Sequence, residues 1–482
     1  MTPLAVAITL GLYILILLSA AYYSSRKARN ADYFIAGRSL QWQMAAMAMV
    51  AAAMSGITFV SVPGSVAADS FSYMQMTLGF TVGQFVIAFV LIPIFYKHKV
   101  VSLYEYLEGR FGSVSHKSGA WFFFVSKVTI AALRLYIMCV ALQILLYDHY
   151  NIPFFVNALV SVGVIWLATR RGGVKSLIWT DTLKTLCLVG SLILSILYIT
   201  QGLDWSFLQM VDQVSQNPHS QIFFFDDPSS PKYFWKMFLA GVFTLIAMTG
   251  LDQDMMQCNL SCVDYRHAQK NIVVTALCQM VVIMLFLVLG VLLYEYAAAY
   301  SLDIPEKSDQ LFSFIAVESG LPMIVGVLFI LGLTASTFAS SASSLTALTT
   351  SCTVDLLGGA KSRTEVELTG VRHTVHLALA VIITLLVLVV GEFSDQSVIN
   401  VLFKFVGYTY GPILGMFTFG MVTKWRVHDR WVWLVAVISL IISVVGEQVV
   451  LQQFGYRIGF ELLIYNAMIT FVGMMLLIKR GE

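Results

Sequence analysis

Apolar runs of about 20 residues recur along this chain of 482 residues, and each is long enough to span a bilayer as a helix. Only 12% of the residues are charged, whereas a soluble domain carries roughly 25%. No soluble domain of any size fits between the runs. The pattern therefore predicts an all-α membrane protein and excludes a soluble enzyme.

Thirteen runs are predicted to be transmembrane helices. They cover approximately residues 3–23, 42–67, 74–96, 118–146, 152–170, 175–200, 233–257, 271–297, 321–355, 369–391, 397–422, 430–450 and 458–478. The longest external segment, residues 201–232, is interpreted as a turn region. A short outer helix is expected at Glu306–Val317.

Basic residues are concentrated in every second loop between these spans. These alternate loops together hold 21 of the 29 lysines and arginines. These residues are Arg26, Lys27, Arg29, Arg38, Lys97, Lys99, Arg110, Lys117, Arg170, Arg171, Lys175, Arg266, Lys270, Lys361, Arg363, Arg372, Lys424, Arg426, Arg430, Lys479 and Arg480. The opposite loops hold only Lys232, Lys236, Lys307 and Arg457. Because Lys and Arg accumulate in cytoplasmic loops, we expect the N-terminus outside and the C-terminus inside.

Four basic residues fall within predicted spans. Lys127, Lys184 and Lys404 are interpreted as side chains that snorkel from the membrane edge. Arg134 lies nearer the middle of its span, where a charge needs a partner or a water-filled cavity. Both a structural ion pair and a contact to substrate remain open for Arg134.

One predicted span changes character halfway along its length. Residues 334–353 read TASTFASSASSLTALTTSCT, so hydroxyls replace the large apolar side chains that precede them. On helical spacing Ser336, Ser340, Ser343 and Ala347 share one face. Hydroxyl and carbonyl oxygens suit a small hard cation. Small residues also allow close helix packing, so an ion site and a packing seam are both open.

Two other spans contain residues that interrupt a helix. Ser55-Gly56 lies in the middle of the second span and Thr249-Gly250 in the seventh. Spans two to six and seven to eleven form two blocks of five, whose orientations must be opposite. Paired interruptions in inverted blocks are typical of transport sites. Asp181, at the inner end of span six, is either a helix cap or part of an ion path.

The chain has no pattern typical of an enzyme, a metal site or a disulfide framework. Its six cysteines are scattered, and Cys258 with Cys262 has only His267 as a nearby third ligand. The eight histidines fall in loops or near span ends. We therefore expect no enzymatic activity, no cofactor and no nucleic-acid partner. A sensor input domain is a weaker alternative, because no soluble output domain is visible.

Five segments resemble the sodium/solute symporter family, which includes sodium-coupled sugar, sialic acid, proline, iodide and vitamin carriers. In chain order they are residues 32–38 (DYFIAGR), 55–59 (SGITF) with Pro63, 102–112 (SLYEYLEGRFG), 172–181 (GGVKSLIWTD) and Asp252-Gln253 with Gln257. They occur in the right order relative to thirteen spans, so the resemblance covers nearly the whole chain.

The resemblance implies a five-plus-five inverted repeat with broken first and sixth core helices in one domain over residues 1–482. An extra N-terminal helix and loop would occupy 1–41, the repeats 42–200 and 233–425, and two extra C-terminal helices 430–482. A sodium site would lie between the first and eighth core helices. The implied ligands are the main-chain carbonyls of Ala51, Met54 and Ser336 and side-chain oxygens at positions 339 and 340. In this chain these two positions are Ala339 and Ser340.

Position 339 departs from the family, which usually has a hydroxyl there. A water, Thr337 or Ser343 would have to replace it, or the site is weakened, or the register of the match is off by one residue. A second sodium site or ion exit would use Asp181 with Ser343, although Ala342 removes one expected ligand.

The resemblance also implies a central substrate cavity. The candidate substrate-binding residues are Ser55, Thr58, Phe80, Gln84, Arg134 and Asp252. Phe80 and Gln84 are one helical turn apart and can face the same cavity, although Phe80 is equally compatible with a core aromatic. Arg134 would favour an anionic solute, because guanidinium pairs well with carboxylate.

The predicted function is sodium-coupled import of a small organic solute by alternating access in the inner or plasma membrane. The solute is a sialic or other organic acid, a sugar or an amino acid. The coupling ion is Na+, and the expected partners are the solute, sodium and the lipid bilayer. A sodium-independent facilitator or channel of the same fold is the alternative.

Overall fold

The computed structural model describes residues 3–26, 33, 40–54, 56–98, 103–171, 174–357, 364–393, 398–456 and 458–479. Within these ranges the regular elements are helices. Two isolated bridges, Leu40 with Cys262 and Val427 with Ile478, join extended backbone. The all-α prediction is confirmed.

Helices occupy each of the thirteen predicted ranges. The first half contains α1 (Pro3–Ser25), α3 (Trp42–Ala53) with α4 (Gly56–Gly64), α6 (Tyr73–Val86) continued by η3 (Ile87–Leu91) and α7 (Ile92–His98), α9 (Ser113–Leu142), α10 (Phe154–Thr169) and α11 (Val174–Gly202). The second half contains α13 (Phe234–Leu245) with η7 (Ile246–Gly250) and α14 (Gln253–Leu260), α15 (Tyr265–Ala299), α17 (Met323–Ser351), α19 (Glu365–Phe393), α20 (Val398–Val422), α21 (Val432–Phe454) and α22 (Leu462–Leu476).

Among the described helices, nine are long and apolar enough to cross a membrane, and a bent pair at residues 234–260 makes up to ten. Two shorter apolar helices are α10 and α22. The protein is therefore a multi-pass membrane protein. The division into two inverted blocks of five and the domain limits stay predictions.

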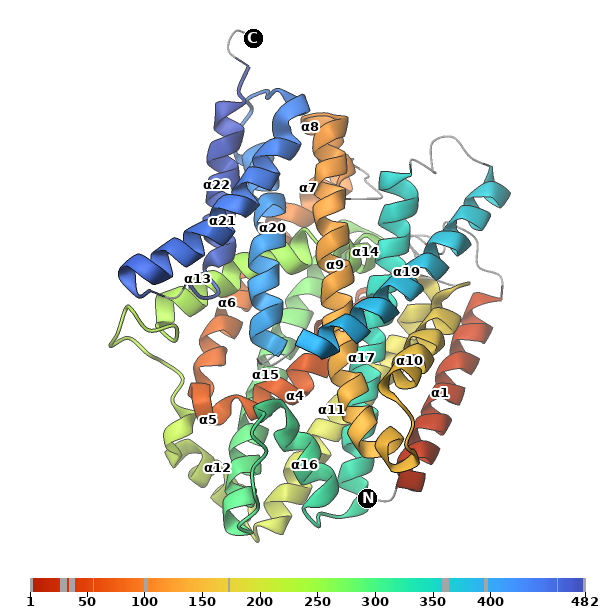
Figure 1. Cartoon of the computed structure of the whole chain (residues 1–482), viewed down its shortest axis with the longest axis vertical. Coiled ribbons are helices and arrows are strands. Elements are labelled where there is room, and N and C mark those ends of the chain that lie inside the picture. The colour runs from red at the N-terminus through yellow and green to blue at the C-terminus, as the bar shows by residue number, and fades with distance from the viewer. Residues whose placement is uncertain are drawn as a thin grey trace.

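The segments between the long helices contain short helices. Leu311–Glu318 forms α16, close to the expected outer helix. Residues 201–232, interpreted above as a turn region, also contain α12 (Phe207–Gln216). Ser206 and Gln209 form a reciprocal capping box at its start. Both short helices lie at the lower end of the molecule in Figure 1.

The first predicted helix break is present. Helix α3 ends at Ala53, Met54 has φ −91° and ψ 87°, and α4 begins at Gly56. Ser55 lies outside the described residues. A helix end leaves its last carbonyl groups without donors from a following turn. Main-chain oxygens are therefore available near Met54.

The second predicted break follows Gly250. Helix α13 passes into the π-helical segment η7, and α14 then starts at Gln253 after a bend of 64°. The Asp252 side chain caps α14 by accepting a hydrogen bond from the Asp254 N–H at 2.8 Å. Pi-helical segments inside α-helices often mark functional sites.

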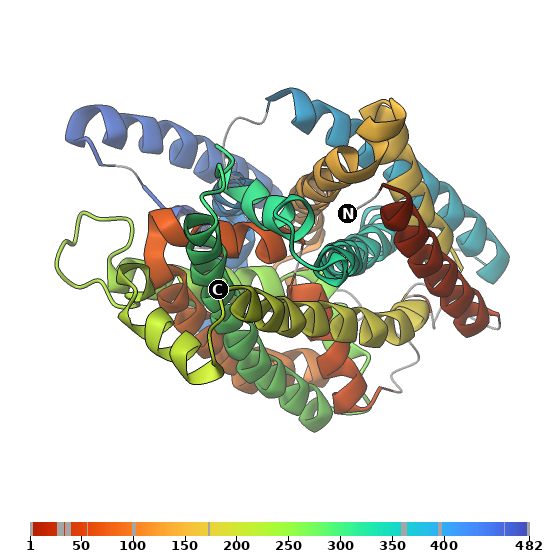
Figure 2. The same ribbon diagram turned by 90° about the horizontal axis from the view of Figure 1, so that it is seen from below.

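Helix α17, which carries the hydroxyl tract, is central and packs against α9 and α11 (Figure 1). Within residues 334–353 only Ser343 and Cys352 are partly exposed. Helices α1 and α21 lie on opposite flanks in both views (Figures 1 and 2). The hydroxyls are therefore kept away from lipid, whereas α1 and α21 are at the periphery.

Candidate functional site

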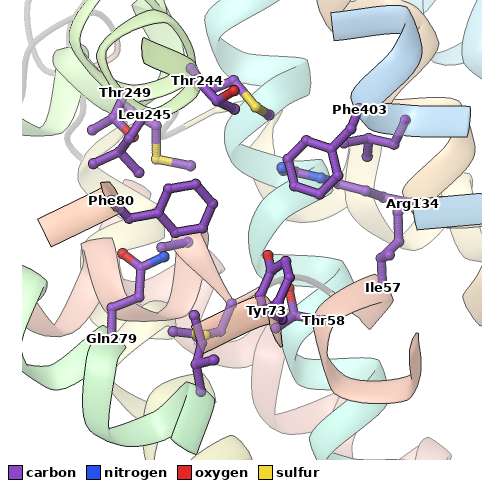
Figure 3. Close-up of a pocket in the computed structure, with 16 residues that line it drawn as sticks. Ile57, Thr58, Tyr73, Phe80, Arg134, Thr244, Leu245, Thr249, Gln279 and Phe403 are labelled. Atoms are coloured by element: carbon purple, nitrogen blue, oxygen red, sulfur yellow. The ribbon is translucent and has the colours of Figure 1, made fainter. Parts of the chain in front are cut away.

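A cavity of about 90 Å³ lies beside both helix breaks. Its walls come from the end of α3 and from α4, α6, α9, α13 with η7, α14, α15 and α20. Figure 3 shows the lining residues, which are Ala53, Met54, Ile57, Thr58, Tyr73, Phe80, Arg134, Thr244, Leu245, Met248, Thr249, Met255, Gln279, Ile283, Leu402 and Phe403. The cavity is largely apolar, with few polar groups.

Three of the predicted substrate residues, Thr58, Phe80 and Arg134, are brought together in this lining. Gln84 is buried behind it and donates from Nε2 to Oε1 of Gln279, a lining residue, at 2.8 Å. Gln84 thus orients Gln279. Ser55, a further candidate, lies outside the described residues.

Arg134 is the principal charged group of the cavity. Its side chain extends from α9 into the space opposite Phe80 (Figure 3). Only 6% of the residue is exposed, and its Nε and Nη1 have no hydrogen-bond partner among the described residues. Buried donors are nearly always paired in native proteins. This guanidinium therefore has free donors where a bound anion would accept them.

Asp252 does not line the cavity; it belongs to a buried ionic cluster next to it. Its Oδ2 lies 2.9 Å from Lys127 Nζ and accepts a hydrogen bond from the Tyr410 hydroxyl. Lys127 Nζ also lies 2.7 Å from Asp254 Oδ2. Asp254 in turn accepts hydrogen bonds from Ser343 and, at 3.0 Å, from Ser344. The cluster joins α9, α14, α17 and α20.

Two lysines predicted to snorkel are instead buried. Lys127 and Lys184 are 2% and 1% exposed. Lys184 pairs with Asp181, one turn earlier in α11, at 2.9 Å. The snorkelling prediction was wrong for both, because carboxylates inside the helix bundle neutralise them. Lys404 is half exposed and pairs with Glu447 at 2.8 Å.

Helix α17 passes the first break, where Thr337 adjoins Gly56, and two of the expected sodium ligands, Ser336 and Ser340, lie on this helix. Ser336 and Ser340 are fully buried, and each donates its hydroxyl hydrogen to a carbonyl of its own helix, Leu333 at 2.9 Å and Thr337 at 3.2 Å. A donating hydroxyl keeps its oxygen lone pairs. Both oxygens can therefore still coordinate a cation. Ala339 is buried and offers no side-chain oxygen.

Thr337 lies against the start of α4. A Cβ built on Gly56 would be 2.0 Å from Thr337 Oγ1. That oxygen is buried and has no hydrogen-bond partner among the described residues. Of the two hydroxyls considered as replacements for position 339, Thr337 adjoins the break, whereas Ser343 is bound to Asp254.

Several site residues were not identified from the sequence. Tyr73, Thr244 and Gln279 line the cavity but carry no motif of their own, and Thr249 was noted only as part of a helix interruption. The position of Thr249 directly before Gly250, at the predicted helix break, was the sequence feature that could have identified it as a site residue. The role of Lys127 as a partner of Asp252 and Asp254 depends on contacts between distant segments.

The fold is shared with solved transporter structures. The substrate-bound outward-open state of a Na+-coupled sialic acid symporter has a TM-score of 0.84 at 19% identity, with 99% of each chain covered. Mhp1, a nucleobase-cation-symport-1 family transporter, has a TM-score of 0.54 at 14% identity, with 92% of each chain covered. The molecule therefore has the helical architecture of membrane transporters with broken helices.

The chain belongs to the sodium:solute symporter family, which matches residues 33–430. The human sodium-coupled monocarboxylate transporter 2 is 23% identical over 407 residues, covering 82% of this chain and 64% of the relative. The rabbit sodium-dependent multivitamin transporter is 26% identical over 396 residues, covering 80% and 61%. The chain thus spans just under two thirds of the length of these relatives.

Proposed function

We propose that this protein is a sodium-coupled symporter that imports a small monocarboxylate. The observation that carries the proposal is the buried Arg134, whose Nε and Nη1 have no partner among the described residues and which lines a mostly apolar cavity. A carboxylate can accept two parallel hydrogen bonds from a guanidinium. The names of the human and mouse relatives, sodium-coupled monocarboxylate transporters, agree with this chemistry.

The size of the cavity supports a small solute. An engineered protein cavity of about 150 Å³ holds benzene, and the cavity here has about 90 Å³. A short carboxylate fits such a volume. The solute's carboxylate would meet Arg134, and its short apolar part would contact Phe80 and Leu245.

Sodium would bind between the first break and α17. The proposed ligands are the main-chain carbonyls of Ala51, Met54 and Ser336 and the hydroxyl of Ser340, as the family pattern implies. Thr337 Oγ1 would supply the oxygen that Ala339 lacks, because it lies unpaired against Gly56. Five oxygen ligands of this kind suit a hard monovalent cation.

The mechanism follows from the position of this ion site. Sodium would hold α3 and α4 against α17 and stabilise the cavity in which the solute binds. Opening of the opposite side would separate these helices and release both. We further propose that the protein lies in the inner or plasma membrane with its N-terminus outside, as the basic loops indicate.

The experiment is uptake by purified protein in liposomes with an inward sodium gradient. Labelled lactate, pyruvate, butyrate, glucose, proline and a sialic acid are offered separately. We expect sodium-dependent uptake of the short monocarboxylates only. Uptake of glucose or proline but not of the carboxylates would contradict the solute assignment. Equal carboxylate uptake in sodium and in potassium would instead indicate a facilitator.

A further inference from the structure

Lys127 occupies an unusual position for a membrane lysine. Its side chain is 2% exposed, and its Nζ lies 2.9 Å from Asp252 Oδ2 and 2.7 Å from Asp254 Oδ2. A buried charge is tolerated when opposite charges and hydrogen bonds surround it. The ammonium is thus held as a fixed monovalent cation between two carboxylates.

The same cluster includes hydroxyls from the α17 tract. Ser343 and Ser344 both donate to the carboxylate of Asp254. Ser343 is the hydroxyl that the family resemblance implies for a second sodium site. A carboxylate flanked by hydroxyl oxygens is a set of hard ligands for a monovalent cation. In this protein Lys127 already contacts that carboxylate.

The other carboxylate considered for a second ion is also neutralised. Asp181 is 5% exposed and pairs with Lys184 at 2.9 Å. The Asp181 carboxylate is therefore matched by a charge from its own helix. Asp254 shares the single ammonium of Lys127 with Asp252, so the second positive charge that balances these two carboxylates is that of Arg134.

Among the described residues beside the cavity, the charges balance without a second ion. Lys127 and Arg134 supply two positive charges, and Asp252 and Asp254 supply two negative ones, close enough to Arg134 to attract it electrostatically. One sodium and one monocarboxylate add no net charge to this buried region. A second sodium would add an uncompensated charge, which is costly away from water.

We propose that Lys127 is a tethered cation that takes the place of a second sodium. The protein then moves one sodium with each monocarboxylate, and the cycle carries no net charge. This inference rests on the proposed symport of a monocarboxylate. It identifies Lys127 as a residue that determines the coupling ratio without contacting the solute.

The first test uses the wild-type protein in liposomes. Initial uptake of labelled sodium and labelled lactate is measured in parallel, and lactate uptake is repeated at imposed membrane potentials. We expect one sodium per lactate and a rate that does not respond to potential. Two sodium ions per lactate, with uptake accelerated by an inside-negative potential, would overturn the inference while leaving sodium-coupled symport intact. Absence of sodium-dependent lactate uptake would reject the proposed function itself.

The second test changes the tethered charge. Lys127→Arg keeps the charge, and we expect it to retain one sodium per lactate. Lys127→Met removes the charge, so a second sodium is needed and the sodium dependence of uptake steepens towards a Hill coefficient of two. The double variant Lys127→Met/Asp254→Asn removes one charge of each sign and is expected to return to one sodium.

The double variant also decides the case in which Lys127→Met is inactive. If Lys127→Met/Asp254→Asn transports lactate with a single sodium, the proposal is supported. The double variant then differs from the inactive Lys127→Met in having its positive and negative charges balanced again. A double variant that elutes as folded protein but remains inactive would overturn it. A Lys127→Met variant that transports lactate with an unchanged single-sodium dependence would overturn it as well.

Discussion

Thr337 and Gly56 touch so closely that a methyl group on Gly56 would lie 2.0 Å from Thr337 Oγ1. This contact joins the hydroxyl-rich helix α17 to the first residue of α4, immediately after the break in the preceding helix. The proposed sodium site is built around this junction, so its geometry is sensitive to small changes in either residue.

Gly56→Ala is expected to separate α4 from α17. The added methyl group has no space, and overpacking of this kind costs about 1–3 kcal/mol. We expect the half-saturating sodium concentration for uptake to rise at least severalfold and the melting temperature to fall. Gly190→Ala in α11 is the matched control, because a methyl group there meets nothing within 4 Å. Identical sodium dependence in both variants would show that the junction does not shape the ion site.

Substitutions that remove an oxygen from the proposed sodium site should weaken sodium binding, and a substitution that adds an oxygen should strengthen it. Thr337→Val and Ser340→Ala each remove one oxygen and should raise the half-saturating sodium concentration severalfold. Ala339→Ser adds a hydroxyl at a position of the proposed site that lacks a side-chain oxygen, and should lower the half-saturating sodium concentration. The exposed Thr374, substituted by Val, serves as the control. Sodium titration of lactate uptake is the measurement, and unchanged titrations for Thr337→Val and Ser340→Ala would refute this ligand set.

Arg134→Gln removes the charge that we assign to the solute carboxylate. A hydrogen bond to a charged group contributes about 1.5–3 kcal/mol, so the half-saturating lactate concentration should rise at least tenfold. Arg134→Lys keeps a charge but loses the planar pair of donors and should be intermediate. Arg266→Gln replaces an exposed arginine and should match wild type. If Arg134→Gln retains wild-type lactate affinity, Arg134 does not bind the solute.

Phe80→Leu is expected to change the preferred length of the solute. Phe80 is buried, forms one wall of the cavity and makes an edge-to-face contact with Tyr73 at 6.2 Å between ring centroids. A smaller side chain enlarges the space beside the solute's apolar end. Competition assays should show longer monocarboxylates inhibiting lactate uptake more strongly than in wild type. Phe89→Leu, at a residue that is 62% exposed, should leave the length preference unchanged. A length preference that changes in Phe89→Leu but not in Phe80→Leu would contradict the role of Phe80 as a wall of the cavity.

The helices and their breaks could be predicted from the sequence because their signals are local. Apolar runs fix the spans, and Gly56 and Gly250 lie at the two positions where the helices are interrupted. Arg134 could be identified because a charged side chain in the middle of a membrane span needs a partner or a water-filled cavity. The structure adds that Nε and Nη1 of Arg134 have no hydrogen-bond partner among the described residues, and its contact with the solute stays a prediction.

The ionic cluster could not be predicted, because its members come from distant parts of the chain. Lys127 meets Asp252 across 125 positions of sequence, and nothing near Lys127 indicates a carboxylate partner. Snorkelling was the local interpretation and was wrong. Similarly, the sequence offered both Thr337 and Ser343 as substitutes at the ion site, and only their contacts with Gly56 and Asp254 distinguish them.

The most direct test of the account is the steady-state accumulation of lactate in liposomes at a series of imposed sodium gradients. With one sodium per lactate, a tenfold inward sodium gradient should give close to tenfold lactate accumulation, whatever the membrane potential. If the lactate concentration inside the liposomes never exceeds the concentration outside, whatever the sodium gradient, transport is not coupled to sodium. That result would contradict the account and leave a facilitator as the remaining function.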